Sequence, residues 1–322
     1  MATTCSGDNA LRLLLNIGKY AGTLYIDDFE VYYTKSSNTI PLTDEEKKKA
    51  LTLALQNWIY GMMEATEGKV KAWDVVNEAL SGEDKDGDGK FDLQSAKRGN
   101  VKPDDAKNNF YWQDYLGDID YVRTAVAAAR KGFADAGGTP EDLKLFINDY
   151  NLESDWDQNG KLKSLIQWIK DWEADGVTKI DGIGSQMHIS CYGNPKTQEA
   201  KKNAIENMLK LMAESGKLVR ISELDMGYVD ANGKEVKTAD MTEEQHKEMR
   251  ALYEFVVKKY LEIIPENQQW GICQWCATDS PANSGWRAGL PVGLWDLDYY
   301  RKHTYAGFAA GLGASEYWNN AK

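Results

Sequence analysis

The sequence lacks long apolar runs and is poor in basic charge. Its 322 residues contain no stretch of about 18 consecutive apolar residues, so no transmembrane helix is expected. The segment Met1 to Gly7 also lacks the apolar region of a secretory signal peptide. The formal net charge is −12. Nucleic acid and anionic membranes are therefore disfavoured partners, whereas a neutral polysaccharide carries no such penalty.

Cysteine and histidine are too few and too scattered for an obvious metal site. The chain has four cysteines and three histidines. One Cys-x-x-Cys pair, Cys273 and Cys276, occurs in an expected strand. Residues three apart on a strand point to opposite faces, so these two thiols should diverge. We expect structural, buried cysteines rather than a zinc or redox site.

From residue 43 onward, helical and strand patterns alternate. A capping box, Thr43-x-x-Glu46, opens the first helix. The elements expected after it lie at 70–77, 114–136, 143–148, 161–174, 181–188, 196–215, 217–223, 242–262, 270–276 and 302–312. This alternation is typical of an α/β fold with a parallel sheet. Five strands are found in the pattern, whereas a closed (β/α)8 barrel has eight.

The first of these strands ends in Trp73-Asp74-Val75-Val76-Asn77-Glu78. Its residues 70–76 are mostly apolar, as in a barrel strand buried on both faces. In a (β/α)8 barrel the active site lies at the C-terminal ends of the strands, which is where Asn77 and Glu78 fall. A bare Asn-Glu pair would otherwise indicate a helix-capping Asn followed by a surface Glu.

Four later strand ends carry further polar motifs. They are Asn148-Asp149-Tyr150-Asn151, Asp181-Gly182-Ile183-Gly184-Ser185-Gln186-Met187-His188, Ser222-Glu223-Leu224-Asp225, and Gln274-Trp275 followed by Thr278-Asp279-Ser280. Together with the Asn-Glu strand they resemble, in order, glycoside hydrolase family 10, the retaining endo-β-1,4-xylanases. The resemblance covers residues 43–312 and implies an α/β fold of the TIM (β/α)8-barrel type.

The resemblance implies retaining hydrolysis by two carboxyl groups about 5–5.5 Å apart. Glu78 would be the general acid/base, with its pKa raised by the neighbouring carboxylate. Glu223 would be the nucleophile. Without the family context, Glu223 could equally be an exposed Glu at a strand end.

The same resemblance implies the residues of the cleft. Asn77 would donate to the sugar 2-OH. Gln186 and His188 are two apart on one expected strand and so point the same way. His188 and Asp225 would keep the nucleophile ionised and oriented. The residues expected to stack on or cover xylose rings are Tyr150, Trp275 and Trp286, the last together with Arg287.

A separate motif, Asp84-Lys85-Asp86-Gly87-Asp88-Gly89, matches the opening of an EF-hand calcium loop. Position 12 of such a loop, normally a bidentate Glu, is Ser95. Two interpretations stay open: a weak structural Ca²⁺ held by Asp84, Asp86 and Asp88, or a solvated acidic loop. We expect no cofactor to be required.

The N-terminal part does not fit the barrel. The three βα units that the family has before its Asn-Glu strand are not found. Two strands are expected instead, at 10–17 and 23–33, resembling the end of a family-4-type carbohydrate-binding β-sandwich. We therefore expect a module remnant over 1–34 and a catalytic domain, with barrel strands 4–8, over 35–322. Alternatively, the strands within 10–33 help to close a reduced barrel.

Three functions are compatible with the sequence. The first is a retaining endo-β-1,4-xylanase acting on xylan or xylo-oligosaccharides, from a parent protein that is secreted, cell-surface or periplasmic. The second is a carbohydrate-binding fragment with little catalysis, and the third a calcium-loop scaffold. An open five-stranded sheet would also leave unpaired edges, which self-association could cover.

Overall fold

The computed structural model describes residues 21–23, 25 and 40–314. The chain divides into two units, residues 1–41 and 42–322. The strands expected at 10–17 and 23–33 lie, apart from Thr23 and Tyr25, outside the described residues, as does nearly all of the expected module remnant 1–34. The fold below is that of the second unit.

A parallel sheet forms its centre. The strands are β1 (Ala72–Asn77), β2 (Lys144–Asp149), β3 (Gly182–Ser185), β4 (His188–Tyr192), β5 (Leu218–Val229) and β6 (Gln269–Gln274). The order is β1-β2-β3-β5-β4, and β6 also pairs with β5. Every pairing is parallel. The long β5 has three neighbours: its first half pairs with β3 and β6, and its second half pairs with β4.

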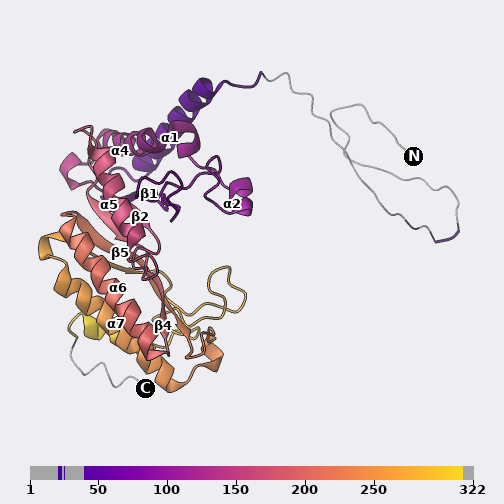
Figure 1. Cartoon of the computed structure of the whole chain (residues 1–322), viewed down its shortest axis with the longest axis vertical. Coiled ribbons are helices and arrows are strands. Elements are labelled where there is room, and N and C mark those ends of the chain that lie inside the picture. The colour runs from indigo at the N-terminus through magenta and orange to yellow at the C-terminus, as the bar shows by residue number, and fades with distance from the viewer. Residues whose placement is uncertain (1–20, 24, 26–39, 315–322) are drawn as a thin grey trace. The chain divides into compact units, whose positions relative to one another are not determined.

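Helices connect the strands and cover the sheet. The α-helices are α1 (Asp44–Ala65), α2 (Pro103–Asn108), α3 (Gln113–Leu116), α4 (Asp118–Asp135), α5 (Gly160–Glu173), α6 (Pro195–Glu214), α7 (Glu243–Ile263) and α8 (His303–Gly311). Three short 3-10 helices are η1 (Pro140–Asp142), η2 (Thr238–Asp240) and η3 (Glu266–Gln268). Figure 1 shows α5, α6 and α7 side by side along the sheet. None of the described helices is both long and apolar enough to cross a bilayer.

Most expected elements are confirmed, but two of them are interrupted, and the strand expected at 217–223 continues to Val229. The capping box at Thr43 and Glu46 is present at the start of α1. The helix expected at 114–136 is two helices, because Gly117 adopts φ 86° between α3 and α4. The strand expected at 181–188 is broken between β3 and β4, because Met187 has a left-handed backbone with φ 57°.

The core lies between the sheet and its helices. Leu145 and Ile147 of β2 and Val219 of β5 are fully buried, as are Phe133 of α4 and Trp172 of α5. Burying each such side chain contributes about 1.5–3 kcal/mol relative to leaving it exposed. Apolar strands against amphipathic helices thus give the α/β barrel type expected from the sequence.

The barrel is not closed within the described residues. β1 and β6 each have a pairing partner on one side only. On α1, beside β1, the indole of Trp58 is 69 % exposed. A hollow of about 450 Å³ opens there between α1 and β1. This apolar edge is uncovered among the described residues, and the expected deficit of βα units stays a prediction.

The cysteine expectation is only partly right. Cys191 on β4 is buried, and Cys276 is partly buried. Cys273 is exposed, so the expectation of buried cysteines is wrong there. The physical reason is that β6 is an edge strand, where Trp270 is exposed as well.

Candidate active site

The parallel register gathers the polar strand ends at one edge of the sheet. Asn77 at the end of β1 pairs with Asn148 on β2, and Asn148 pairs with Gly184 on β3. Because parallel strands point the same way, side chains from positions far apart in sequence meet here. Glu78 and Glu223 both reach this edge.

Glu78 is held in an uncommon backbone conformation. Its φ is 54°, in the left-handed region that non-glycine residues rarely adopt. Its N–H donates to the Asn148 carbonyl at 2.8 Å, and its own carbonyl accepts from Gln94 Nε2 at 2.7 Å. Gln186 Nε2 donates to the carboxylate Oε1 at 2.8 Å. Backbone and side chain of Glu78 are therefore both fixed by neighbours.

Glu223 is tied to the same network. Asn148 Nδ2 donates to Glu223 Oε1 and to Asn77 Oδ1, both at 2.9 Å. Gln186 Nε2 lies 3.3 Å from that same Asn77 oxygen. The two glutamates are thus joined through three amide side chains. Both bonds use Asn77 Oδ1, so within the described residues its Nδ2 stays available as a donor.

Behind Glu223 stands His188. Its Nε2 is 3.4 Å from Glu223 Oε2, and its Nδ1 is 3.1 Å from Asp225 Oδ1. Asp225 is fully buried and also accepts from the indole N–H of Trp286 at 2.6 Å. Its burial places Asp225 behind His188 rather than on the cleft wall. A carboxylate only accepts, so the imidazole Nδ1 carries a proton toward Asp225.

The expected aromatic residues surround this network. The Trp275 and Trp286 rings lie 5.8 and 4.6 Å from the His188 ring, and Trp275 is 51 % exposed. Arg287 donates to the backbone carbonyl of His188 at 2.9 Å and stands 3.6 Å from Asp225. Trp286 and Arg287, the residues expected to cover the site, therefore both lie next to His188.

Tyr150 stands over a buried ion pair. Lys161 Nζ lies 3.4 Å from the Tyr150 ring centroid and 2.7 Å from Asp149 Oδ1. The other Asp149 oxygen accepts from Leu80 N–H at 3.1 Å, just after Glu78. Burial, with the nearby charges of Asp149 and Glu78, raises the pKa of Tyr150 to about 12. Its hydroxyl is protonated at neutral pH with or without this shift and can donate a hydrogen bond.

Two residues of the network were not identified from the sequence. Asn148 lies in the quoted Asn-Asp-Tyr-Asn motif, so its strand-end position was a usable signal. Gln94 lies 16 residues after Glu78 in an irregular loop. No local pattern distinguishes it from other polar loop residues, and only the folded loop brings it to Glu78.

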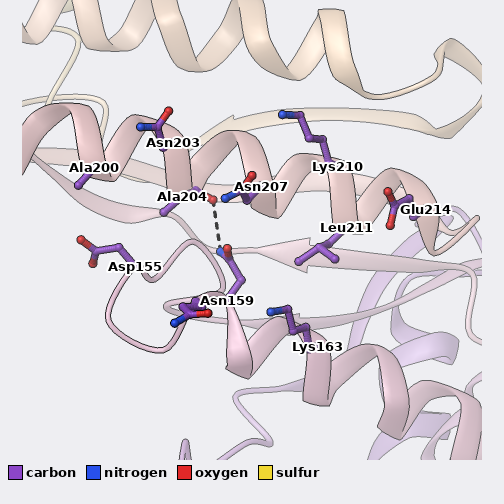
Figure 2. A pocket seen from close by; sticks show the side chains of 11 residues that line it. Asp155, Asn159, Lys163, Ala200, Asn203, Ala204, Asn207, Lys210, Leu211 and Glu214 are labelled. Carbon is purple, nitrogen blue, oxygen red and sulfur yellow. Dashed lines mark hydrogen bonds between the residues drawn. The ribbon is translucent and has the colours of Figure 1, made fainter.

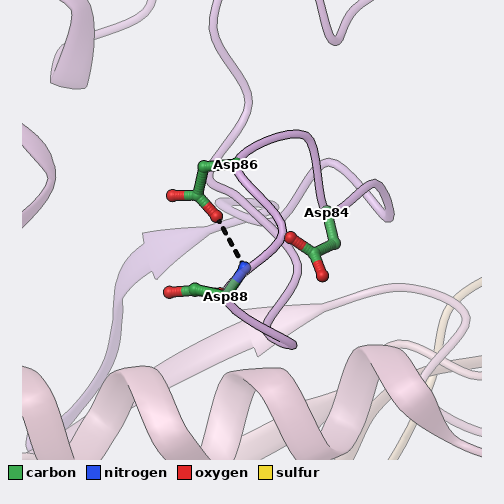
Figure 3. Close-up of side chains that lie close together, drawn as sticks. All are labelled: Asp84, Asp86 and Asp88. Atoms are coloured by element: carbon green, nitrogen blue, oxygen red, sulfur yellow. Dashed lines mark hydrogen bonds between the residues drawn. The ribbon is translucent and has the colours of Figure 1, made fainter.

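The acidic loop at 84–90 has hydrogen bonds of its own. Ligand atoms of Asp84, Asp86 and Asp88 lie within 4.8 Å of one another, all exposed (Figure 3). Asp84 accepts from Gly87 and Gly89 N–H at 2.7 and 3.0 Å. Ser95, at the twelfth position, is buried and hydrogen-bonded to Asp114 instead. Three carboxylates could hold a cation. Ca²⁺ takes about six to eight oxygen ligands in total, so most of the remaining ones would be water.

Comparisons with known proteins agree with this fold. The model of glycosyl hydrolase family 10 matches residues 31–310. "Endo-beta-1,4-xylanase Xyn10C" of Cellvibrio japonicus is 30 % identical over 262 residues, covering 76 % of this chain and 37 % of that protein. "Endo-1,4-beta-xylanase A" of Thermotoga maritima is 31 % identical over 261 residues, covering 80 % and 20 %.

A solved structure is also similar. It is a mutant of xylanase10C from Cellvibrio japonicus in complex with xylopentaose, with TM-score 0.62 and 26 % identity. The match covers 83 % of this chain and 49 % of that one. The chain thus spans half or less of these relatives.

Proposed function

Because this chain belongs to glycosyl hydrolase family 10, we propose that it hydrolyses internal β-1,4-xylosidic bonds of xylan with retention of configuration. The observation that carries the proposal is the hydrogen-bond network joining two strand-end glutamates, Glu78 and Glu223, through Asn77, Asn148 and Gln186. The relatives named as xylanases support the substrate class. The −12 charge suits a neutral polymer.

In the first step, Glu223 attacks the anomeric carbon. The C–O bond to the leaving sugar breaks as Glu78 gives its proton to the departing oxygen. A covalent glycosyl-enzyme forms on Glu223. In the second step, Glu78 takes a proton from water, the water oxygen attacks the anomeric carbon, and Glu223 leaves as a carboxylate. General acid–base catalysis of this kind contributes about 10²–10⁴-fold.

The surrounding groups tune these two carboxyls. Asn148, and the His188 ring when it carries a proton on Nε2, stabilise the ionised Glu223. Asp225 orients that ring through Nδ1 and acts as a positioning residue. The free Asn77 amide donor is suited to the sugar 2-OH, a bond that strengthens in the transition state.

Rings of the sugar chain would stack on Tyr150, Trp275 and Trp286. Flat aromatic faces match the C–H faces of xylose, and Trp275 is open to solvent. The xylopentaose in the similar structure supports an extended oligosaccharide as ligand. We extend the proposal to the organisation of the chain: residues 35–322 form the catalytic unit, 1–34 are the module remnant, and the parent protein acts outside the cytoplasm.

The decisive experiment follows product stereochemistry and the two glutamates. Early NMR spectra of xylan digests should show β-anomers. Glu78→Ala should lose xylan hydrolysis yet keep activity on aryl xylosides with good leaving groups, which need no acid. Glu223→Ala should lose both until azide is added. α-Anomers, or equal losses on both substrates in both variants, would contradict these roles.

A further inference from the structure

A buried ion pair lies at the active-site edge of the sheet. Lys161, in the first turn of α5, is 4 % exposed, and Asp149, at the end of β2, is fully buried. Lys161 Nζ donates to Asp149 Oδ1 at 2.7 Å, its one hydrogen-bond acceptor among the described residues. Desolvation offsets most of the attraction within such a pair, so it adds little stability over an apolar pair of similar volume. Its effect is therefore expected in the groups that it holds in place.

Asp149 holds the backbone just after Glu78, the proposed acid. Its Oδ2 accepts from the Leu80 N–H at 3.1 Å. The carbonyl of the preceding residue, Asn148, accepts from the Glu78 N–H at 2.8 Å. Two adjacent residues at the end of β2 thus bind the chain at Glu78 and two residues beyond it. Because Glu78 has a strained φ of 54°, these bonds oppose relaxation of its backbone.

Lys161 also contacts the aromatic ring next to Asp149. Its Nζ lies 3.4 Å from the centroid of the Tyr150 ring, a distance that places the ammonium over the ring face. The Tyr150 N–H donates at 2.9 Å to the same Asp149 oxygen that Lys161 binds. One ammonium therefore holds Asp149 and Tyr150 together, and it leaves only the other face of the ring for a sugar.

The loop before α5 sets the position of Lys161. Asn159, which precedes α5, is buried and has a left-handed φ of 58°. Its Nδ2 donates to Leu152 O at 2.9 Å and to Ala204 O on α6 at 3.3 Å, the second bond being marked in Figure 2. Asp157 Oδ2 accepts from the Lys161 N–H at 3.0 Å. The ammonium thus extends from a backbone that its neighbours fix.

We propose that Lys161 is a positioning residue for proton donation by Glu78, acting through Asp149 on the backbone at Leu80. The inference rests on the proposed function, which makes Glu78 the acid. With the ammonium in place, Asp149 is held as an acceptor for the Leu80 N–H, and the Glu78 carboxyl extends from one fixed backbone position. Without it, Asp149 is a buried carboxylate with no cation, and the acceptor for Leu80 is no longer fixed.

The test is the ratio of kcat on aryl xylobiosides with poor and good leaving groups. Lys161→Met keeps the length of the side chain and removes its charge, so this ratio should fall about tenfold. The double variant Asp149→Asn with Lys161→Met leaves no buried ion unpaired. It should recover much of the melting temperature while the ratio stays low.

The chain offers a matched control in Lys90. Its Nζ makes the same two kinds of contact, with Asp171 at 2.6 Å and with the Trp168 ring at 3.5 Å from the centroid. Lys90→Met should therefore keep the native ratio. A merely structural role for Lys161 predicts equal losses on both leaving groups in Lys161→Met and a native ratio in the double variant. Either result would overturn the proposal, as would an equal fall of the ratio in Lys90→Met.

Amide hydrogen exchange gives a second readout that needs no turnover. Relative to the amides of β5, the Leu80 amide should exchange about tenfold faster in Lys161→Met and at the native rate in Lys90→Met. If Lys161→Met does not fold, the double variant supplies both readouts. A native chain that cleaves no xyloside means that the proposed function fails, and the exchange rates then decide the positioning role. An unchanged Leu80 rate overturns that role.

Discussion

Removing the Gln94 side chain should impair the acid function of Glu78 and little else. Gln94→Ala deletes the bond from Nε2 to the Glu78 carbonyl. The backbone bond from Gln94 N–H to Ala79 O, 2.8 Å, stays in place. Glu78 then keeps its strained left-handed φ of 54° with one anchor fewer.

The magnitude follows from two opposing contributions. A left-handed non-glycine residue costs about 1–3 kcal/mol, which the surrounding bonds offset. A neutral hydrogen bond contributes about 0.5–1.5 kcal/mol net. Losing about 1 kcal/mol of that support lowers the ratio of correctly placed to displaced carboxyl roughly fivefold, since about 1.4 kcal/mol corresponds to tenfold.

The assay is kcat/KM on aryl xylobiosides with good and poor leaving groups. If Glu78 is the acid, as proposed, a poor leaving group needs its proton, so its rate and xylan hydrolysis should fall by up to about fivefold. A dinitrophenyl leaving group needs no proton and should be released at nearly the native rate. Gln167→Ala, which removes an exposed amide bonded to Asp171 on α5, is the control. Equal losses on both substrates, or none, would refute the reasoning.

Other expectations are equally direct. Asp225→Asn should lower kcat, since Asp225 acts through His188, and should also lower the melting temperature, because the buried amide sets an N–H against the donors of His188, Trp286 and Arg287; a loss in KM alone would contradict the positioning role. If Asp84, Asp86 and Asp88 hold Ca²⁺, chelation should lower the melting temperature and Asp86→Ala should abolish that effect; no shift means a solvated loop. Burial lowers the pKa of His246 to about 4, so between pH 6.5 and 4 the unfolded state binds more protons than the folded state. The free energy of unfolding should therefore fall on acidification through this window, and it should fall less in His246→Gln. Melting curves at pH 7 and 5 test this. The apolar edge at Trp58 should make the chain associate, which light scattering would detect as a molar mass above 36.2 kDa. If the chain is instead a monomer, residues 10–33 should cover the edge, and removing them should lower the stability of the chain.

The strands and the polar residues at their ends could be predicted from the sequence. A buried parallel strand must be apolar, whereas the residues at its end can be polar. The apolar runs that end in Asn77-Glu78 and in Glu223 are therefore visible as local sequence patterns. The helices follow in the same way from periodicity and from the capping box at Thr43. The family resemblance then supplied the roles, which local pattern alone could not.

Only the tertiary structure decided how these tips are connected. Asn148 joins Glu223 to Asn77 because β1 and β2 are neighbours in register, and sequence separation does not encode that pairing. Met187 breaks the strand expected at 181–188, so that β4 pairs with the far half of β5. Cys273 is exposed because its strand lies at an open edge. Burial, register and contacts such as that of Gln94 depend on which elements pack together, and packing is a property of the whole chain rather than of any local stretch.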